Sequence, residues 1–359
     1  MKKVIISVTN DLTTDQRVDK VANSLFNAGF LVLVLGAVSN KKHILSERKY
    51  DFYRFKMFFK KNFFFYFEFN VKLFWFLLRN KSDILLSNDL DTLSANFFVS
   101  KLKKIKLVYD SHELFTELPE LLERPNVKFI WLSMEKFFLK RIQFSYTVSK
   151  SIASYYKSKY GVDMSVVSNF PHIKMINNSL TPVKKNKKII YQGAVNKDRG
   201  IELMIQAMTY IDAQLYIVGG GDLLKKMIKY VEKLELKNKV IFVGKLPFCE
   251  LFEITKTADL GLSFEEDTCL AYRYSLPNKI FDYINAEIPI LVSDLPEFKN
   301  IIDSHPVGFL LKSRDVESVS EQINHLLSIP KLNWLPALKK AKNTFCWKNE
   351  EQTLLTFFN

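Results

Sequence analysis

The stretch that decides the fold is Ile-Ile-Tyr-Gln-Gly-Ala-Val-Asn-Lys-Asp-Arg-Gly, residues 189–200. It predicts an apolar strand that ends at Gln192, then a polar loop, then a helix that begins near Gly200. The same order of short apolar strand, loop and helix recurs in both directions along the chain. Short apolar strands that alternate with helices are typical of a parallel sheet covered on both faces, so the sequence predicts an α/β fold.

The chain contains two such runs, which suits 359 residues divided into two domains. We predict strands at residues 4–8, 31–35, 84–87, 107–109 and 146–148, and again at 189–192, 215–218, 240–243, 260–263, 290–292 and 308–311. Residues 171–188 hold two Pro and five Lys and no acid, which is typical of a linker. The expected domains are therefore 1–170 and 189–344, both Rossmann-like, with the linker at 171–188 and a closing segment at 345–359.

The net charge of +14 is unevenly distributed. Residues 1–170 hold 27 Lys+Arg and 16 Asp+Glu, a balance of +11, whereas residues 171–359 hold 25 and 22, a balance of +3. The first half is thus the part drawn to a polyanion such as anionic lipid or a phosphorylated substrate. A coding bias toward Lys and Phe is an alternative source of the total charge.

Three Cys and no signal-peptide core indicate a reducing, cytoplasmic location. The richest apolar stretch, residues 58–78, is interrupted by Lys60, Lys61, Glu68 and Lys72, so it is not expected to span a membrane. Peripheral association with the inner face of the membrane stays open.

In parallel α/β sheets ligands bind at the carboxyl ends of the strands, so the loops that follow the strands hold the candidate site residues. In the second domain, Gly219 follows a strand and opens a glycine run that suits close approach of an anion to the backbone. A plain tight turn explains that run equally well. Arg199 precedes a helix, where a guanidinium can neutralise a diphosphate.

The segment Tyr-Arg-Tyr-Ser-Leu-Pro-Asn-Lys-Ile-Phe-Asp-Tyr, residues 272–283, predicts the start of another helix. Ser275 is the expected N-cap, with Pro277 in the first turn. Lys279 lies in that turn against the helix dipole, which indicates an anion to bind, unless it is a solvated surface lysine. Asp282 is placed to accept hydrogen bonds from vicinal hydroxyls.

In the first domain, His112 directly follows a strand within Tyr-Asp-Ser-His-Glu, residues 109–113, which favours a functional role over a structural one. The polar loop after the first strand holds Asn10, Asp15 and Arg17. A simple capped turn accounts for that loop about as well as a binding role does.

The order of these segments resembles the retaining glycosyltransferases of the GT-B fold, of the family-4 or group 1 type, over essentially the whole chain. The resemblance rests on the Thr9-Asn10-Asp11 loop, Tyr109-Asp110-Ser111-His112-Glu113, Thr147-Val148-Ser149, Val167-Ser168-Asn169-Phe170-Pro171, Gly193 to Arg199-Gly200, Leu276-Pro277-Asn278-Lys279, and Phe345-Cys346-Trp347 before a terminal helix.

The resemblance implies two facing Rossmann-like domains with a cleft between them and a terminal helix that crosses back onto the first domain. The second domain would hold a nucleotide-diphosphate sugar through Gly193, Arg199, Gly219, Lys245, Ser275, Asn278, Lys279 and Asp282. The first would hold the acceptor through Asn10, Asp15, Arg17 and Asp89, and His112 would contact the transferred sugar or its leaving phosphate.

Two positions depart from the family pattern. Ala194 stands where the first base of a basic pair is usual, and Tyr274 stands where the first of two Glu is usual. Asp282 replaces the second Glu with a shorter carboxylate. Glu265, Glu266 and Asp267 lie upstream as candidates for compensation.

The resemblance implies glycosyl transfer with retention, no required cofactor and no metal, because no Asp-x-Asp in the donor half has the form of a metal site. The nearest, Asp89-Leu90-Asp91, is in the acceptor half. Catalysis would then rest on His112, Arg199 and Lys279, with backbone amides near Gly193 and Ser275 helping to stabilise the departing diphosphate.

Residues 53–79 mix aromatic residues with Lys and Arg, which suits an amphipathic face on anionic headgroups. A lipid-linked or polysaccharide acceptor in cell-surface synthesis fits that pattern, although a helix packed on the sheet fits it equally. The rival functions are a non-catalytic nucleotide-sugar binder and a sugar-nucleotide epimerase. Nucleic acid is not an expected partner, since no recognised module is present.

Overall fold

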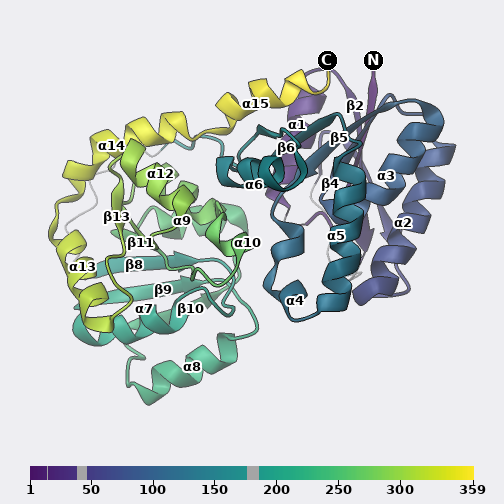
Figure 1. The fold of residues 1–359 in the computed structure, drawn as a ribbon. Helices are drawn as coiled ribbons and strands as arrows, with labels where there is room; N and C mark the ends of the chain where they lie inside the picture. Colours follow the sequence, from purple (N-terminus) through teal and green to yellow (C-terminus); the bar gives the residue numbers. More distant parts are fainter. Residues whose placement is uncertain (14, 39–46, 176–185) are drawn as a thin grey trace. The chain divides into compact units, whose positions relative to one another are not determined.

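The computed structural model describes residues 1–13, 15–38, 47–175 and 186–359. The chain divides into two compact units (Figure 1). Unit 1 comprises Met1–Asn169 with Lys348–Asn359, and unit 2 comprises Phe170–Trp347. Of the predicted linker at 171–188, residues 176–185 lie outside the described residues.

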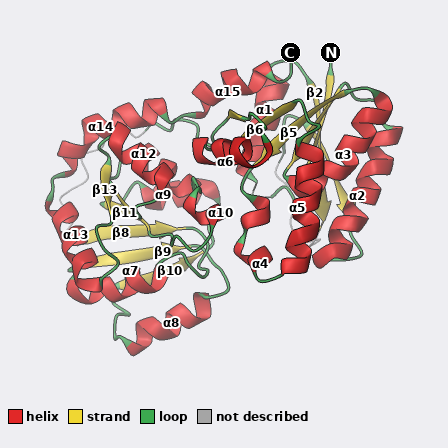
Figure 2. Ribbon diagram, in the orientation of Figure 1, coloured by secondary structure: helices red, strands yellow, loops and turns green. Residues whose placement is uncertain are grey.

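Unit 1 alternates strands and helices along the chain (Figure 2). Its described elements are β1 (Lys3–Ser7), α1 (Gln16–Asn27), β2 (Leu31–Val38), β3 (Asp51–Lys56), α2 (Asn62–Arg79), β4 (Ile84–Asn88), α3 (Leu90–Lys103), β5 (Lys106–Ser111), the 3₁₀ turn η1 (Phe115–Glu117), α4 (Pro119–Leu122), α5 (Pro125–Leu139), β6 (Phe144–Thr147), α6 (Lys150–Tyr160) and β7 (Ser165–Val166).

The strands of unit 1 pair in parallel in the order β3-β2-β1-β4-β5-β6-β7. The order reverses between β1 and β4, and this switch point is where open α/β sheets bind ligands. Helices α2, α3 and α5 lie side by side over one face of the sheet (Figure 1). A core of Ile5, Leu35, Phe69, Leu73 and Leu85 joins α2 to the strands beneath it.

Local sequence signals set the helix ends. Asp15 caps α1 by accepting a hydrogen bond from the amide of Val18 at 3.0 Å. Ser149 caps α6 in the same way through the amide of Ile152. Gly161 ends α6 at φ +69°, a conformation that costs glycine no strain.

Unit 2 repeats the pattern. Its described elements are β8 (Lys187–Gln192), α7 (Ile201–Ala207), η2 (Met208–Tyr210), β9 (Ala213–Val218), α8 (Leu224–Lys233), β10 (Val240–Gly244), α9 (Phe248–Thr255), β11 (Leu260–Ser263), α10 (Leu270–Arg273), α11 (Asn278–Asn285), β12 (Ile290–Val292), α12 (Pro296–Ser304), β13 (Gly308–Leu310), α13 (Val316–Ser328) and α14 (Lys331–Thr344). The parallel order is β10-β9-β8-β11-β12-β13, with its switch point between β8 and β11. Two parallel Rossmann-like units confirm the predicted fold class.

The last helix, α15 (Trp347–Thr356), carries the chain back into unit 1. The carboxylate of Glu350 accepts a hydrogen bond from the amide of Ser168 at 2.7 Å. Beyond the helix, Phe357 packs on Tyr146 and Phe358 packs on Phe30, with ring centroids 5.1 and 6.3 Å apart. The terminal helix therefore belongs to unit 1.

The sequence missed β3 and β7. Strand β3 mixes aromatic with charged residues, and its first three residues, from Asp51 on, are exposed, so this edge strand lacks the uninterrupted apolar run of the central strands. Strand β7 is only two residues long. None of the helices in the described part of the chain is both long and apolar enough to cross a membrane.

Candidate functional site

The first cluster lies at the switch point of unit 1 and is organised by a buried ion pair. The guanidinium of Arg17 donates to both carboxylate oxygens of Asp110, at 2.9 and 2.7 Å, and to the carbonyl of Val167 at 2.8 Å. Arg17 is only 3% exposed and Asp110 is fully buried. These contacts occupy the guanidinium inside unit 1, where it fixes Asp110 at the end of β5.

Asp110 in turn contacts His112, the residue that follows β5. The Nε2 atom of His112 lies 3.1 Å from the carboxylate of Asp110 and 3.1 Å from the side-chain oxygen of Asn88. On the other side of the ring, Nδ1 lies 3.3 Å from the carboxylate of Asp89. Both ring nitrogens therefore face acceptors within unit 1.

The carboxylates favour a charged imidazole. Burial alone would lower the pKa of His112, but Asp89 and Asp110 outweigh it and raise the pKa to about 9. Burial alone would raise the pKa of Asp110, but Arg17 and His112 lower it to about 2. At neutral pH His112 is thus a cation next to an ionised Asp110.

Asp89 lies between β4 and α3 in a rare conformation for a residue with a side chain, at φ +56°. Its amide donates to the carbonyl of Asp110, and its carboxylate accepts from the amide of His112, each at 2.8 Å. Burial raises the pKa of Asp89 to about 8 against the pull of His112. The loop after β4 is thereby tied to the loop after β5.

Two further residues of the acceptor-side prediction, Asn10 and Asp15, form a capped turn. Asn10 donates to Asp15 at 2.6 Å and accepts from the amide of Leu12 at 2.9 Å, while Asp15 caps α1. The neighbouring Thr9 donates to Asp91 at 2.5 Å, which connects the loop after β1 to α3. The structure thus brings Arg17 and Asp89 to His112 and uses Asn10 and Asp15 to shape the adjoining loop.

The second cluster lies at the switch point of unit 2, where the residue at position 219 has to be glycine. A Cβ on Gly219 would lie 1.8 Å from the carbonyl oxygen of Gly193, so no side chain fits there. Both residues have positive φ, +147° and +139°. The glycines therefore bring the loops after β8 and β9 into backbone contact.

Glu265 is the centre of this second cluster. It follows β11, is fully buried, and accepts hydrogen bonds from Lys279 at 2.5 Å and from Ser263 at 2.6 Å. The guanidinium of Arg199 lies 3.5 Å from Oε1 of Glu265, the oxygen that accepts from Lys279. One carboxylate thus faces two cations that the sequence placed in the donor site.

The charges in this cluster reinforce one another. Burial would raise the pKa of Glu265, but Lys279, Ser263 and Arg199 hold it below its ordinary value. Burial alone would lower the pKa of Arg199, but Glu265 raises it above its ordinary value. With two cations and one central anion, the trio retains a net positive charge.

Aromatic rings support both cations. Arg199 lies over Tyr272, 4.5 Å from the ring centroid, and Lys279 lies over Tyr191 at 4.4 Å. The Nζ of Lys279 also lies 3.6 Å from the point where Gly193 would carry a Cβ. The buried Nε of Arg199 makes no hydrogen bond to any described residue. A buried donor of this kind is open to a water molecule or an ion.

Asp282 lies one turn along α11 from Lys279 and is held by the end of β8. The side chain of Gln192 donates to Asp282 at 2.7 Å and accepts from Thr255 at 2.9 Å. This chain of contacts fixes the carboxylate of Asp282 next to the Gly193 loop.

Lys245 and Gly220 also come together, because the Cε atom of Lys245 lies 3.1 Å from the Cβ position of Gly220. Asn278 is exposed as the first residue of α11. The predicted N-cap at Ser275 is wrong: Pro277 precedes α11, and the hydroxyl of Ser275 donates to the carbonyl of Tyr272 at 2.8 Å. The N-cap of α11 is Pro277, two residues after Ser275, and no side-chain cap hydrogen bond is made at this helix start.

Sequence reasoning gave no defined role to Glu265 or Asp110. Glu265 lies just beyond the buried strand β11 at the switch point of unit 2, and Asp110 lies near the carboxyl end of the buried strand β5, next to β4. Those positions are the signal that could have found them. The lysine at 279 is buried, at 7% exposure, rather than solvated. Among the residues that the structure describes, no group of three or more His, Cys, Asp or Glu is arranged to hold a metal ion.

Two family models match this chain. The model for Glycosyltransferase Family 4 matches residues 16–171, and the model for Glycosyl transferases group 1 matches residues 173–341. Together they cover both units, and the chain belongs to this family of GT-B glycosyltransferases.

Known relatives agree with this assignment. A chitobiosyldiphosphodolichol beta-mannosyltransferase of Candida albicans is 23% identical over 240 residues, which are 59% of this chain and 52% of the relative. The chain thus spans about half the length of that relative.

Solved structures show the same fold. The sucrose-phosphate synthase of Thermosynechococcus elongatus superposes with a TM-score of 0.84 at 14% identity, over 100% of this chain and 98% of that one. Anabaena HepE in complex with UDP-glucose gives a TM-score of 0.75 at 14% identity, over 100% and 99%.

Proposed function

We propose that the protein transfers a sugar from a nucleotide-diphosphate donor to a lipid-linked or polysaccharide acceptor, with retention of configuration, in the synthesis of a cell-surface polysaccharide. The observation that carries the proposal is the trio of Arg199, Glu265 and Lys279 at the switch point of unit 2, next to Gly193, in which Glu265 and Lys279 are buried. A net positive site with close backbone approach suits a diphosphate.

In the proposed reaction the bond between the sugar C1 and the diphosphate oxygen breaks, an acceptor oxygen bonds to C1, and the acceptor's proton passes to the departing diphosphate. Arg199 and Lys279 stabilise the charge that develops on the departing diphosphate, so no metal ion is required for this task. Asp282, fixed by Gln192, would accept hydrogen bonds from the ribose hydroxyls. Lys245 would lie near the base, beside Gly220.

Unit 1 would bind the acceptor and the transferred sugar. His112 is held as a cation by the ionised Asp110, with Asp89 on the other side of its ring, and we assign it the orientation of the sugar. Arg17 would act as a positioning residue, since its guanidinium holds Asp110. Asp89 and the Asn10–Asp15 turn would shape the acceptor side.

The acceptor class is supported by the relative from Candida albicans, a mannosyltransferase named for the acceptor chitobiosyldiphosphodolichol. The excess of cations in unit 1 and its exposed aromatic side chains favour an acceptor at an anionic membrane surface. We therefore propose that the protein works on the cytoplasmic face of a membrane.

The test is a transfer assay with the full chain, radiolabelled UDP- and GDP-sugars and undecaprenyl- or dolichyl-diphosphate-linked sugar acceptors. Label that moves into the lipid fraction supports transfer, and the anomeric coupling constant of the product, compared with the donor, tests retention. Inversion would overturn the stereochemical part alone. Absence of transfer with every donor would overturn the proposed function.

The second candidate is a non-catalytic nucleotide-sugar binder, favoured by Ala194 and Tyr274, which differ from the family pattern. It predicts donor binding without transfer or hydrolysis. A sugar-nucleotide epimerase would instead convert the donor with no acceptor present, which chromatography of the nucleotide sugar detects.

A further inference from the structure

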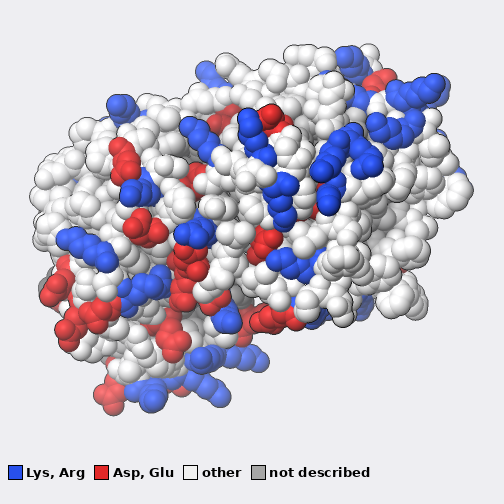
Figure 3. All heavy atoms as spheres, in the orientation of Figure 1, with Lys and Arg blue, Asp and Glu red and all other residues white. Residues whose placement is uncertain are grey.

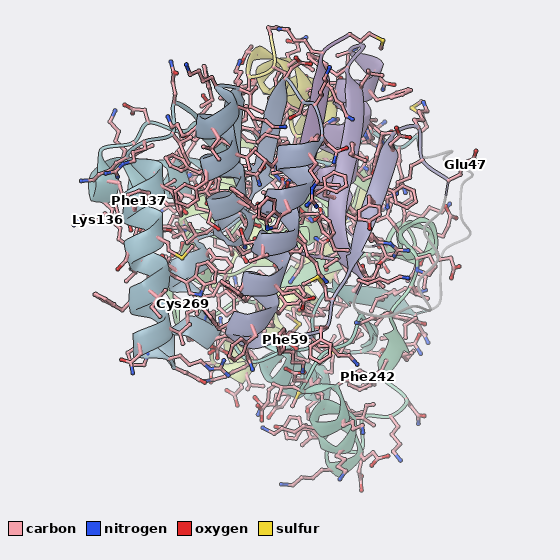
Figure 4. The ribbon with its side chains drawn as sticks, turned by 90° about the vertical axis from the view of Figure 1, so that its right-hand side faces the viewer. Glu47, Phe59, Lys136, Phe137, Phe242 and Cys269 are labelled. Atoms are coloured by element: carbon pink, nitrogen blue, oxygen red, sulfur yellow. The ribbon has the colours of Figure 1, made fainter. Side chains whose placement is uncertain are left out.

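A buried acid contacts the segment that follows His112. Glu135 of α5 is fully buried, whereas its neighbours Lys136 and Phe137 are exposed on the outer side of that helix (Figure 4). Burial raises the pKa of Glu135 above its ordinary value. A buried carboxyl group costs stability unless hydrogen bonds compensate it, so its partners indicate why the fold keeps it.

Three hydroxyl groups donate to Glu135. They belong to Thr116 of η1, at 3.2 Å, and to Tyr156 and Tyr160 of α6, at 3.4 and 2.5 Å. Lys and Arg side chains gather at the surface over α5 and α6 (Figure 3). The Nζ atom of Lys159 on α6 lies 3.9 Å from Oε2 of Glu135. The carboxyl group of Glu135 thus joins α5 to α6 and to η1.

Tyr156 extends this connection to the end of β5. Its hydroxyl is buried and lies 3.1 Å from the hydroxyl of Ser111, the last residue of β5. The hydroxyl of Ser111 also donates to the carbonyl of Glu113 at 3.1 Å, and the carbonyl of Ser111 accepts from Thr147 of β6 at 2.9 Å. Because His112 lies between Ser111 and Glu113, these contacts hold the residues on both sides of it.

Glu117 holds the other end of this segment. Its carboxylate accepts hydrogen bonds from Lys128 of α5 at 2.7 Å and from Tyr155 of α6 at 2.9 Å. Residues 111–117 are therefore attached to helices of the same pair at both ends. An apolar residue in place of a buried acid is often as stable or more stable, whereas a satisfied polar network specifies a single arrangement of its members. This contrast points to a role for the acid at position 135 in the geometry of the segment.

We propose that Glu135 is a positioning residue for His112. It acts through the hydroxyls of Tyr156 and Thr116, which hold residues 111–117 in one arrangement and so keep the imidazole in place. Preorganised site residues depend on such supporting hydrogen bonds, because a small displacement of a reacting group lowers the rate strongly. The proposal rests on the proposed function for the role of His112 in transfer, whereas the hold on the imidazole is measurable without any substrate.

The experiment compares two variants of α6 that lose the same chemical group. Tyr156→Phe and Tyr160→Phe each remove one phenolic hydroxyl that donates to Glu135, and Tyr156 is the one of the two whose hydroxyl also lies next to Ser111. The measurement is the NMR titration of the full chain with isotope-labelled histidine. The chain holds five His, and the signal of His112 is identified by its loss in His112→Gln.

In Tyr156→Phe the pKa of His112 should fall toward 6.5 by about one pH unit or more, and in Tyr160→Phe it should stay at the wild-type value. The charged groups around the imidazole remain in both variants, so a change in its pKa reports a change in its position. They are Asp89, Asp91, Asp110 and Arg17. With the active nucleotide sugar, Tyr156→Phe should also lower kcat about tenfold or more. It should bind UDP and GDP like wild type, because the proposed donor site belongs to unit 2.

A second pair of variants tests Glu135 itself. Glu135→Ala removes the acceptor of all three hydroxyls and should lower the pKa of His112 at least as far as Tyr156→Phe does. The matched control is Phe138→Ala on the same helix, because Phe138 is buried against Phe97 of α3, with ring centroids 5.1 Å apart. It loosens α5 away from residues 111–117, so the pKa of His112 should stay at the wild-type value.

The inference is overturned if the pKa of His112 in Tyr156→Phe equals that of wild type, or if Tyr160→Phe or Phe138→Ala lowers it equally. Loss of kcat in Tyr156→Phe without a change in that pKa would overturn it as well. A fall in the pKa that is confined to the Tyr156 and Glu135 variants, in a protein that transfers no sugar, would support the positioning role and overturn the proposed function instead.

Discussion

Lys279 and Glu265 form a buried ion pair in which the ammonium nitrogen lies 2.5 Å from the carboxylate oxygen. Glu265 is fully buried and Lys279 is 7% exposed, so water screens the pair little. A lysine kept at the start of a helix, against the helix dipole, needs a local carboxylate, and Glu265 supplies it. The pair holds a cation in place before any ligand arrives.

Glu265→Gln should therefore destabilise unit 2. Removing one partner of a buried pair leaves an uncompensated charge and typically costs about 3–5 kcal/mol. Urea unfolding of the variant should show a loss of this order, and a bound nucleoside diphosphate should recover part of it. Glu266→Gln is the matched control, because its partner Arg314 is 40% exposed and surface pairs contribute about 0–1 kcal/mol. Equal stability of the two variants would contradict the central role of Glu265.

Arg199→Ala should lower turnover at least about 100-fold, since one preorganised charge donor is worth about 3–4 kcal/mol in the transition state. The measurement is kcat with the active nucleotide sugar. Lys197→Ala removes an exposed cation from the same loop and should leave kcat within about twofold. Near-normal turnover of the Arg199 variant would remove Arg199 from the mechanism.

The stability of unit 1 should depend on pH through His112. The pKa of His112 in the folded chain is about 9, above the ordinary value of 6.5. The contribution of the charged His112 to the free energy of unfolding is then fully present below about pH 6.5 and is lost as the pH rises toward 9, a change of about 1–3 kcal/mol. The difference in the free energy of unfolding between wild type and His112→Gln, measured by urea unfolding between pH 6 and 9.5, should show this decline. A difference that is flat across the range would show that the imidazole is not held as a cation.

Chelation of metal ions should leave transfer within about twofold, because Arg199 and Lys279 are positioned to neutralise the diphosphate. The measurement is the initial rate in EDTA with and without added Mg²⁺. A rate that collapses in EDTA and returns with Mg²⁺ would show that a metal shares this task.

The sequence predicted the parts of the molecule that depend on local patterns. The strands at 260–263 and 290–292 have the predicted limits, and Gly200 precedes α7 as expected, because buried strands and helix starts carry apolar and glycine signals. Two parallel units followed from the alternation alone. The exposed edge strand β3 was missed because charged residues interrupt its aromatic residues, so it has no continuous apolar run.

The candidate site was predicted less completely. Arg199 and Gly193 were expected near each other from the loop that follows a strand, and Lys279 from the first turn of a helix together with the family resemblance; the structure brings the three together. The contacts of Glu265 with Lys279 and Arg199 join loops that are far apart in sequence, and local sequence patterns do not encode such contacts. The use of Arg17 to hold Asp110 was hidden for the same reason, since 93 residues separate the pair.

The most direct test of the central claim is thermal stabilisation by UDP, GDP, ADP, CMP and NAD, applied to wild type, Arg199→Ala and Asp282→Ala. Specific binding at 100 times Kd stabilises the folded state by about 2.7 kcal/mol. We predict a clear rise in Tm with one nucleoside diphosphate, and a much smaller rise in both variants. No shift with any nucleotide, or the same shift in all three proteins, would contradict a donor site built on Arg199, Glu265 and Lys279.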